Sequence, residues 1–505
     1  MKALPPAYFI GKVRLPETSI FESEIAQLAD AARPRTQIRP RLESERQRIL
    51  HCRYLVEGLY HTFASLNPDL RLSVPGSQKA YSGDPRLSPF SYQFMDEVVK
   101  ALEKLGWAKR YTGFITNKGV HVLSTLVPTG YLLDVFESHG ILWQRLTHRQ
   151  NEKTVFVRLK QKIKSTEKGK SKTLTQPITL PTPNTPAVRS MRANLKLINE
   201  QISSQAICLH LQNDSLKALS KDIAKKNNPT FSFYGEPKKK GRHINFYDVF
   251  LYRVFSNGSI ELGGRFYGGW WQIIPSHYRP YITINGLATY EVDYSAFHPT
   301  MLYALNDIAV PEGDLYDFNY SLPGHPHWDP TTEPYKTVRG IHKKLFNAYL
   351  NDPKGRYRLP YKDTEMIGMS TQQLREQMLF KHPLLTGSQG IGLELQYLDS
   401  QIAEYVMLDL LKDGITCLPV HDSFIVDRRF VDKLEDAMNR AYAKFVPGHP
   451  ELKLEQPPAF SEFQAPFTPD GELDRSAMFA MHESAIHNQY LQSWLSRTRA
   501  RPSPI

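Results

Sequence analysis

Apolar residues recur with helical spacing in several stretches of the chain. They predict helices over 48–66, 92–105, 187–225, 392–412 and 431–445. The clearest repeat, in 392–412, has on one face Leu395, Leu398, Ile402, Val406 and Leu410. Gly414 follows and suits the left-handed residue that ends many helices. We therefore expect 392–412 to be a long helix with one side packed on a core.

Short apolar runs separated by turn residues predict antiparallel hairpins in the second half of the chain. The paired runs are 251–255 with 260–265, 281–284 with 288–292, and 415–420 with 424–426. Asn285-Gly286 is the dipeptide most favoured in two-residue hairpin turns, and Ser256-Asn257-Gly258 is a similar turn signal. Hairpins interleaved with helices predict the α+β fold class.

A different combination precedes these hairpins. After the expected helix over 92–105 come Gly106 and two runs, 107–114 and 120–124, that flank Asn117-Lys118-Gly119. A helix followed by a basic hairpin is the pattern of a winged helix. The functional interpretation is a DNA-contacting module with a lysine on phosphate. A small α+β scaffold without nucleic-acid contact is the alternative, and the sequence leaves both open.

Composition narrows the class of protein. The 505 residues are too many for one ordinary domain, and the net charge of +12 indicates a polyanionic partner, with a merely basic protein as the alternative. There is no run of about 18 apolar residues and no apolar leader, so neither a membrane span nor a signal peptide is expected. Cys52, Cys208 and Cys417 lie far apart. Their spacing argues against a zinc site or a disulfide scaffold and indicates a reducing, cytoplasmic compartment.

Residues 159–187 have the composition of a linker. Their lysines are Lys160, Lys162, Lys164, Lys168, Lys170 and Lys172. Ser, Thr and Gly lie between them, and four prolines follow between positions 177 and 186. Such a segment cannot bury a core, so we expect it to be flexible or extended. Its charge either follows a phosphate backbone or only keeps the linker solvated.

Two aspartates stand at the ends of predicted strands. Asp293 follows the strand over 288–292, and Asp422 lies at the tip of the third hairpin. Joining a nucleotide to a 3′-hydroxyl needs an activated nucleophile and a stabilised leaving group, and two metal ions about 3.5–4 Å apart supply both. Mg²⁺ is commonly held by one or two carboxylates together with substrate phosphates. We expect Asp293 and Asp422 to share two Mg²⁺ ions, or Mn²⁺. Taken singly, a helix cap and a hairpin-turn residue are the simpler interpretations.

Four motifs around these aspartates resemble the palm motifs of family A DNA polymerases. They are Gly263-Gly264-Arg265, Ile274-Pro275 with Arg279, Asp293-Tyr294-Ser295 and Val420-His421-Asp422-Ser423. The Ser after the second Asp is the form found in the related phage-type single-subunit RNA polymerases. The resemblance covers residues 250–445. It implies a polymerase right hand, with a palm on an antiparallel sheet and helical fingers and thumb, that acts on a DNA primer–template with nucleoside triphosphates.

On this basis we divide the chain into six segments. They are an N-terminal helical and basic region (1–85), a winged-helix-like domain (86–158), a basic flexible linker (159–187), a thumb-like helical region (188–249), the palm and fingers (250–460) and a C-terminal tail of unassigned role (461–505). The sequence predicts no oligomeric state.

One segment between the two aspartates resembles the fingers helix of the family. Arg339, Lys343 and Asn347 are four residues apart and share one helical face. Such a cationic face can hold the incoming triphosphate. The family has Asn before Phe, whereas here Phe346 precedes Asn347, and Asn351 replaces an aromatic residue. An ordinary charged surface helix is the alternative.

The remaining site residues follow from the same resemblance. Tyr294 and His298 are expected at the nucleotide, and the residues expected at the nucleic acid are Arg265, Arg279, Gln396 and His421. A polar surface is the alternative for Gln396, and a structural turn residue for His421. His298 stands where the DNA polymerases have a Glu that excludes the 2′-hydroxyl, and Ser423 also departs from them, whereas Gly-Gly-Arg is closer to them. We favour DNA over RNA synthesis.

Other functions remain open. They are an RNA polymerase or primase of the same superfamily, a metal-dependent nuclease that uses the same aspartates, and a non-catalytic DNA-binding protein. A nuclease would not need the cationic helix, and a non-catalytic protein would not need both aspartates. The sequence shows no proofreading-exonuclease cluster and no phosphate-binding P-loop motif. This set of parts would suit a replication protein of a phage, plasmid or other mobile element.

Overall fold

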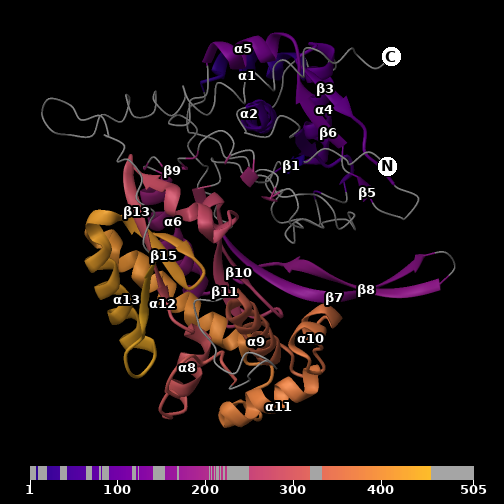
Figure 1. Ribbon diagram of the computed structural model, residues 1–505. Coiled ribbons are helices and arrows are strands. Elements are labelled where there is room, and N and C mark those ends of the chain that lie inside the picture. Colours follow the sequence, from indigo (N-terminus) through magenta and orange to yellow (C-terminus); the bar gives the residue numbers. More distant parts are fainter. Residues whose placement is uncertain are drawn as a thin grey trace, which may run out of the picture.

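The computed structural model describes residues 7–9, 20–34, 42–63, 71–78, 81, 90–115, 121–122, 124–139, 154–167, 170–203, 205, 207–209, 211, 215, 218–219, 222–223, 249–318 and 333–455. Within these ranges, helices and several sheets pack around two separate hydrophobic cores (Figure 1). The mixed α and β class is therefore confirmed. The expected wing turn at 117–119 and the tail 461–505 lie outside the described residues.

The N-terminal unit packs helices against a sheet of order β1-β2-β6-β3. Its helices are α1 Glu22–Ala31, α2 Leu42–Phe63, α4 Tyr92–Lys104 and α5 Tyr131–His139. Its strands are β1 Ala7–Phe9, β2 Arg71–Val74, β3 Ala108–Tyr111, β4 Phe114–Ile115, β5 His121–Val122 and β6 Ser124–Pro128. The expected helix over 92–105 is confirmed as α4, which buries Val98, Val99 and Leu102. Strand β6 pairs with β2 as well as β3, so the expected hairpin is part of a larger sheet.

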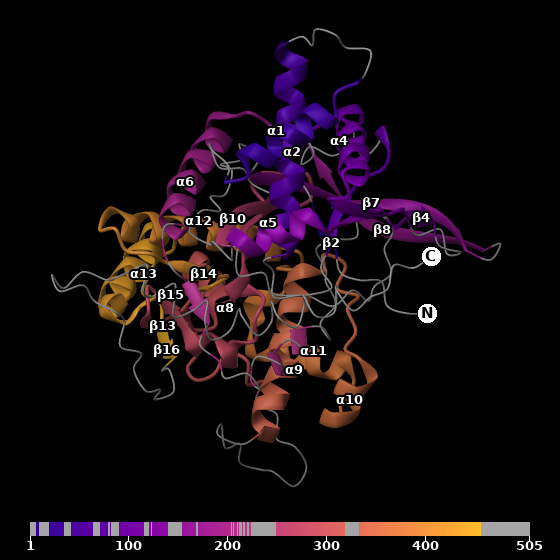
Figure 2. The same cartoon turned by 90° about the horizontal axis from the view of Figure 1, so that it is seen from above.

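The segment 159–187, expected to be flexible or extended, is extended in its described part and is also paired. β7 Val155–Glu167 and β8 Lys170–Leu180 form a long antiparallel ribbon, and α6 Pro186–Ser203 follows. Figures 1 and 2 both show the ribbon running outward from the body of the molecule. Composition misleads here because two paired strands satisfy each other's backbone hydrogen bonds and need no buried core along their length.

The ribbon is continuous with a sheet of order β11-β10-β7-β8. β10 Val249–Phe255 pairs in parallel with the start of β7 and antiparallel with β11 Gly263–Gly269. The expected second strand at 260–265 therefore begins later, at Gly263. Gly263 and Gly264 have φ of +79° and +83°, and a Cβ on Gly264 would lie 2.6 Å from Phe255 Cε1. The irregular pairing at this point requires glycine. It explains why β11 begins at Gly263 and not at residue 260.

A central sheet has the order β14-β15-β13-β12-β9, and β16 pairs with β13. Its strands are β9 Ile207–Leu209, β12 Ile282–Ile284, β13 Leu287–Tyr294, β14 Leu418–Val420, β15 Ser423–Asp427 and β16 Leu452–Glu455. Asn285 and Gly286 both have positive φ, as the expected two-residue turn requires. The two hairpins expected here are confirmed, and the pairing of β13 with β15 joins them.

Helices pack around this sheet (Figure 1). They are α8 Phe297–Leu305, α9 Glu333–Asn351, α10 Tyr361–Ile367, α11 Thr371–Lys381, α12 Gly392–Lys412 and α13 Val431–Phe445, with 3₁₀ helices at Trp270–Gln272, Ser276–Tyr281, Pro383–Leu385 and Arg428–Phe430. The bounds of α12 and α13 are those expected. The helix expected over 187–225 ends at Ser203, because the chain continues into β9. No helix in the described ranges combines the length and apolar character needed to cross a membrane.

Candidate active site

The two predicted metal-binding aspartates lie at the same edge of the central sheet. In the pairing of β13 with β15, Asp293 is opposite Ser423, the residue that follows Asp422. The Tyr294 N–H donates a hydrogen bond to the Asp422 carbonyl oxygen at 3.3 Å. His421 has φ of +60° and turns the chain between β14 and β15. The tertiary fold therefore brings Asp293 and Asp422 to neighbouring strand ends.

Asp293 is electrostatically unusual. Burial and the nearby charge of Asp422 raise its pKa from 3.8 to about 7, and the positive charge of Lys343 partly opposes this shift. Two repelling carboxylates are the oxygen donors that Mg²⁺ prefers, and a bound cation would relieve their repulsion. Among the described residues, no group of three or more His, Cys, Asp and Glu side chains is arranged to hold a metal ion. The pair is thus the candidate ligand set, and it fits an ion whose other ligands are substrate phosphates and water.

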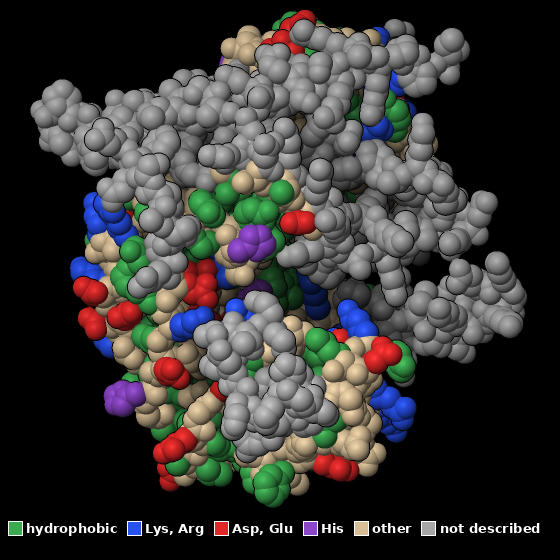
Figure 3. Space-filling model, viewed as in Figure 1, with side chains coloured by type: hydrophobic (Ala, Val, Ile, Leu, Met, Phe, Trp, Pro, Cys, Tyr) green, Lys and Arg blue, Asp and Glu red, His purple; other side chains and the backbone are tan. Residues whose placement is uncertain are grey.

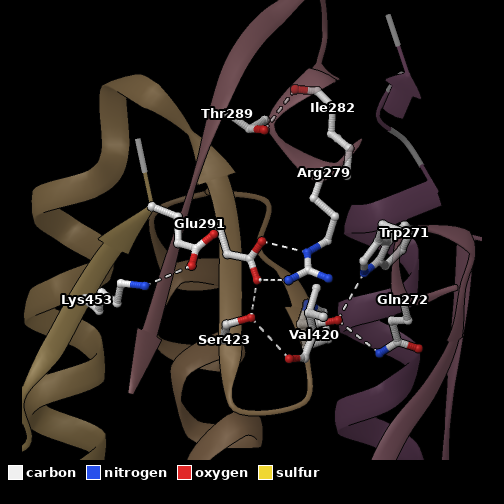
Figure 4. A network of polar contacts seen from close by, with 11 residues as sticks. Trp271, Gln272, Arg279, Ile282, Thr289, Glu291, Val420, Ser423 and Lys453 are labelled. Carbon is white, nitrogen blue, oxygen red and sulfur yellow. Dashed lines mark hydrogen bonds and ion pairs between the residues drawn. The ribbon is translucent and has the colours of Figure 1, made fainter. Parts of the chain in front are cut away.

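A polar network centred on Glu291 joins β13 to β15 (Figure 4). Arg279 donates from Nε and Nη2 to the two carboxylate oxygens of Glu291 at 2.6 and 2.8 Å, and Ser423 Oγ donates to Glu291 Oε1 at 2.5 Å. The Arg279 side chain is only 16% exposed. Arg279 thus holds the strand that carries Asp293, and its expected contact with nucleic acid stays a prediction.

The turn before Asp422 is held by two side chains from the 3₁₀ helix Trp270–Gln272. Trp271 Nε1 and Gln272 Nε2 each donate to the Pro419 carbonyl oxygen at 3.0 Å. Trp271 is fully buried. These bonds fix β14 and thereby the position of the turn that carries Asp422.

His421 is held in this turn as a neutral ring. The Tyr267 ring packs edge-on against it, with centroids 5.8 Å apart. Burial, followed by the charge of Arg265, lowers the pKa of His421. Its Nδ1 atom is buried without a hydrogen-bond partner among the described residues. The expected contact of His421 with a primer end stays a prediction.

A second network joins β11, α8 and α12. Arg265 Nε donates to Asp399 Oδ2 at 2.6 Å, and Arg265 Nη2 lies 3.2 Å from His298 Nε2. His298 Nε2 is itself 3.7 Å from Asp399 Oδ2. Burial alone would raise the pKa of Asp399, but Arg265 and His298 hold it below the ordinary value. Arg265 and His298, which the sequence assigns to different ligands, belong to one cluster organised by Asp399.

Sequence reasoning missed Asp399, although a signal was present. It lies four residues after Leu395, on the side of α12 that faces the core, and is 1% exposed. An acid on the apolar face of a helix is buried only when it has a partner. The same argument applies to Glu404, whose Oε2 accepts a 2.7 Å hydrogen bond from Arg253 Nη1. Gln396, on the same helix, is partly exposed, and its contact with nucleic acid stays a prediction.

The expected helix is confirmed as α9, and two of its basic residues, Arg339 and Lys343, share the ring of Tyr316. Arg339 donates from Nε and Nη2 to the carboxylate of Asp314. The Arg339 guanidinium carbon lies 5.2 Å from the centre of the Tyr316 ring, and Lys343 Nζ lies 5.5 Å from it. Lys343 is exposed, and its charge is felt at Asp293. Lys343, on the cationic face of α9, therefore lies close enough to Asp293 to favour its ionised form.

The reversed order of Phe346 and Asn347 has a packing explanation. Phe346 is fully buried, whereas Asn347 is partly exposed on the face that carries Arg339 and Lys343. Asn351 is exposed and donates to the Asn347 carbonyl oxygen at 2.8 Å. The aromatic side chain of Phe346 is thus buried in the core, and the polar side chain of Asn347 lies on the face of α9 that carries Arg339 and Lys343.

Tyr316 is a site residue that the sequence does not single out. It is 3% exposed, and burial, followed by the charge of Asp422, raises the pKa of its phenol. Its carbonyl oxygen accepts from His342 Nδ1 at 2.8 Å, and the preceding carbonyl, of Leu315, accepts from His382 Nε2 at 2.7 Å. An irregular segment held by such long-range bonds has no periodicity from which to predict it.

Tyr294, next to Asp293, packs into the core. It is 2% exposed, its hydroxyl donates to the Met438 carbonyl oxygen at 2.7 Å, and its ring stacks on Phe297 at 4.3 Å. Its expected contact with the nucleotide stays a prediction, whereas the helix-cap interpretation of Asp293 is wrong. No side chain caps the start of α8, which follows Ala296 in a left-handed conformation, so Asp293 is not a helix cap.

The surface around these elements is hollowed. Figure 3 shows a recess near the centre of the face seen in Figure 1, bordered by basic, acidic and histidine side chains, where β11 and α9 lie in Figure 1.

No family model matches the chain, and no curated protein matches it.

Proposed function

We propose that the chain is a template-directed nucleotidyltransferase, a DNA-dependent DNA polymerase that extends a primer 3′-hydroxyl with the help of two Mg²⁺ or Mn²⁺ ions. One observation carries the proposal. The register of β13 and β15 sets Asp293 and Asp422 at neighbouring strand ends, within the electrostatic reach of Lys343 on α9. A carboxylate pair beside a cationic helix suits a reaction between a metal-bound triphosphate and a hydroxyl group.

In this reaction, the primer 3′-oxygen attacks the α-phosphorus of a nucleoside triphosphate. The bond from that phosphorus to the pyrophosphate oxygen breaks, and the hydroxyl proton leaves to solvent. Metal ions held by Asp293 and Asp422 would supply positive charge to the attacking and leaving oxygens. Lys343 is exposed and can contact a phosphate. The Nη1 atom of Arg339 takes no part in the hydrogen bonds to Asp314 and can donate to a phosphate oxygen as well.

The proposal includes a right-hand architecture. The central sheet would be the palm, α9, α10 and α11 the fingers, and α6 part of the thumb, with the N-terminal unit as a further DNA-contacting module. A primer–template and nucleoside triphosphates would be the partners, in the cytoplasm, where the buried thiols of Cys52 and Cys417 stay reduced. A role in the replication of a phage, plasmid or other mobile element is part of the same proposal.

RNA synthesis is the second candidate, and His298 is the observation that favours it. His298 takes the place of an acid that excludes the 2′-hydroxyl, and Arg265 and Asp399 hold its ring. Replacing His298 with Glu and comparing dNTP with rNTP incorporation tests this. A shift toward dNTPs would show that His298 selects the sugar, and an unchanged ratio would show that it does not.

The central test is primer extension by the full chain with Mg²⁺ and dNTPs or rNTPs. Asp293→Asn and Asp422→Asn keep the side-chain shape and should each reduce extension about 10²- to 10³-fold, the usual cost of removing one electrostatic catalytic group. Asp413→Asn is the matched control, because Asp413 is 54% exposed and its one ion pair among the described residues is with Lys433. Unchanged extension in either site variant would overturn the assignment. Shortening of the primer without addition would indicate a nuclease, and DNA binding without either reaction a non-catalytic protein.

A further inference from the structure

The β7–β8 ribbon carries a large share of the charge of the chain. Residues 154–180 contain one acid, Glu167, against seven basic residues: Arg158, Lys160, Lys162, Lys164, Lys168, Lys170 and Lys172. The resulting net charge of +6 is half of the +12 of the whole chain. The proposed active site does not use this charge, so it requires its own explanation.

The strand register sorts these residues by face. Alternate positions of a strand belong to opposite faces, so positions 160, 162 and 164, all lysine, fall on one face of β7, about 6.6–6.8 Å apart. Their register partners on β8 are Pro177, Thr175 and Thr173. Lysines and hydroxyl groups in a row are the groups that proteins use on phosphate oxygens. The positions of the opposite face alternate between the apolar pairs Leu159↔Ile178 and Ile163↔Leu174 and the polar pair Gln161↔Gln176, and toward the tip they include Lys172 and Lys170, the latter opposite Glu167.

The ribbon begins in the sheet that carries Arg265. Its first residues pair with β10, in the register Arg253↔Val155 to Phe255↔Val157, and β10 pairs in turn with the strand of Arg265. Beyond this point only the two strands continue, away from the body of the molecule in both views (Figures 1 and 2). The ten residues 158–167 of β7 span about 34 Å, close to one turn of a DNA duplex. The major groove of a duplex admits a two-stranded ribbon of this kind.

We infer that the face of the β7–β8 ribbon bearing Lys160, Lys162 and Lys164 binds the sugar-phosphate backbone of a DNA duplex. The inference rests on the proposed function only for naming that duplex as the primer–template. A membrane surface fits less well, because residues 158–180 include no Trp, Tyr or Phe to enter a lipid interface. Lysines also protect exposed strand edges from aggregation, and glutamate would do so equally well. Charge reversal therefore separates that role from phosphate binding.

The test uses the full chain and a fluorescein-labelled primer–template in EDTA, with affinity measured by anisotropy over a salt series. The triple variant Lys160→Gln, Lys162→Gln, Lys164→Gln should bind about 10- to 100-fold more weakly. The slope of log K against log salt should fall in magnitude by about 2–3, or 0.9 per lost phosphate contact. The triple Glu variant should bind more weakly still.

The matched control is Lys412→Gln, Lys433→Gln, Lys444→Gln, which removes the same charge from exposed positions of α12 and α13. It should change affinity less than 2-fold, because only the net charge is altered. Equal losses in both triple variants, or no loss in the ribbon variant, would overturn the inference. So would a Glu variant that stays unaggregated and binds DNA as well as the wild type, which would assign the lysines to edge protection.

Vesicles containing phosphatidylserine provide the last arm. If the ribbon variant loses vesicle binding and keeps DNA binding, the ribbon is a membrane surface and the inference fails. Failure of the proposed function is distinguishable: a wild-type chain that extends no primer, and whose DNA affinity still depends on the ribbon lysines, would reject the polymerase and retain the ribbon. Primer extension by the wild-type chain, together with unchanged DNA affinity in the ribbon variant, would retain the polymerase and reject the ribbon.

Discussion

Ser423 Oγ donates a 2.5 Å hydrogen bond to Glu291 Oε1, across the pairing of β15 with β13. The sequence resemblance leads us to expect a carboxylate at the position of Ser423. A carboxylate reaches the serine from the neighbouring strand instead, two residues before Asp293 in the chain. Arg279 neutralises it by donating to both of its oxygens. The acid next to the candidate metal-binding pair is therefore part of the framework that holds β13.

Arg279→Met should destabilise this framework and leave DNA affinity unchanged. The substitution leaves Glu291, which is 9% exposed, as an unpaired buried charge. Such a loss costs about 3 kcal/mol in unfolding free energy, measured by urea denaturation. Combining it with Glu291→Met should recover much of the stability, because no charge is then left unpaired. Wild-type stability with a large loss of DNA affinity would return Arg279 to the nucleic-acid interface.

Asp293→Asn should raise stability in metal-free buffer at pH 8 while abolishing nucleotide addition. The pKa of Asp293 is raised to about 7, so the folded chain binds the proton more tightly than the unfolded chain does. The stability that this carboxyl contributes is complete below pH 3.8 and is lost as the pH rises through about 7. We expect the variant to gain about 1–3 kcal/mol of unfolding free energy at pH 8 and none below pH 4. This range allows for solvent screening and for the opposing charge of Lys343. Thermal unfolding in EDTA at both pH values checks this, and equal stabilities at pH 8 would contradict it.

Tyr316→Leu should raise the KM for the nucleoside triphosphate about tenfold, because two cation–π contacts of about 0.5–1 kcal/mol each are lost. The ring holds both Arg339 and Lys343. Tyr316→Phe keeps the ring and should retain the wild-type KM, with kcat little changed in both variants. Single-nucleotide primer extension over a range of dNTP concentrations measures both constants. If the Phe variant is as impaired as the Leu variant, the hydroxyl group rather than the ring is required.

His51 should make the N-terminal unit sensitive to mild acid. Its Nδ1 donates to the Gln47 carbonyl oxygen at 2.6 Å, and its Nε2 accepts from the Ser91 N–H at 3.0 Å, so the ring is neutral. Burial lowers its pKa below 6.5. Its contribution to stability is therefore complete above pH 6.5 and is lost as the pH falls toward the folded value. His51→Gln should flatten the dependence of unfolding free energy on pH between pH 5 and 7, and an unchanged slope would exclude His51 as the cause.

Local sequence signals predicted those elements whose pattern repeats. The bounds of α12 and α13 follow from the apolar periodicity, and the turn at Asn285-Gly286 from its backbone requirements. The ribbon was mistaken for a linker, because composition does not report whether two extended segments pair. The later start of β11 was missed because four of its seven residues are glycine, which carries no strand signal.

The site divides in the same way. Residue types and spacing were enough to select Asp293 and Asp422 and the cationic face of α9, because those features are local. Their partners come from distant segments: Glu291 for Ser423, Asp399 for Arg265 and His298, and Tyr316 for Arg339 and Lys343. Only the tertiary structure decided which polar side chains pair within the protein and which are left for a ligand. The physical reason is that a buried charge must find a partner, and the choice of partner depends on packing between elements that are far apart in the chain.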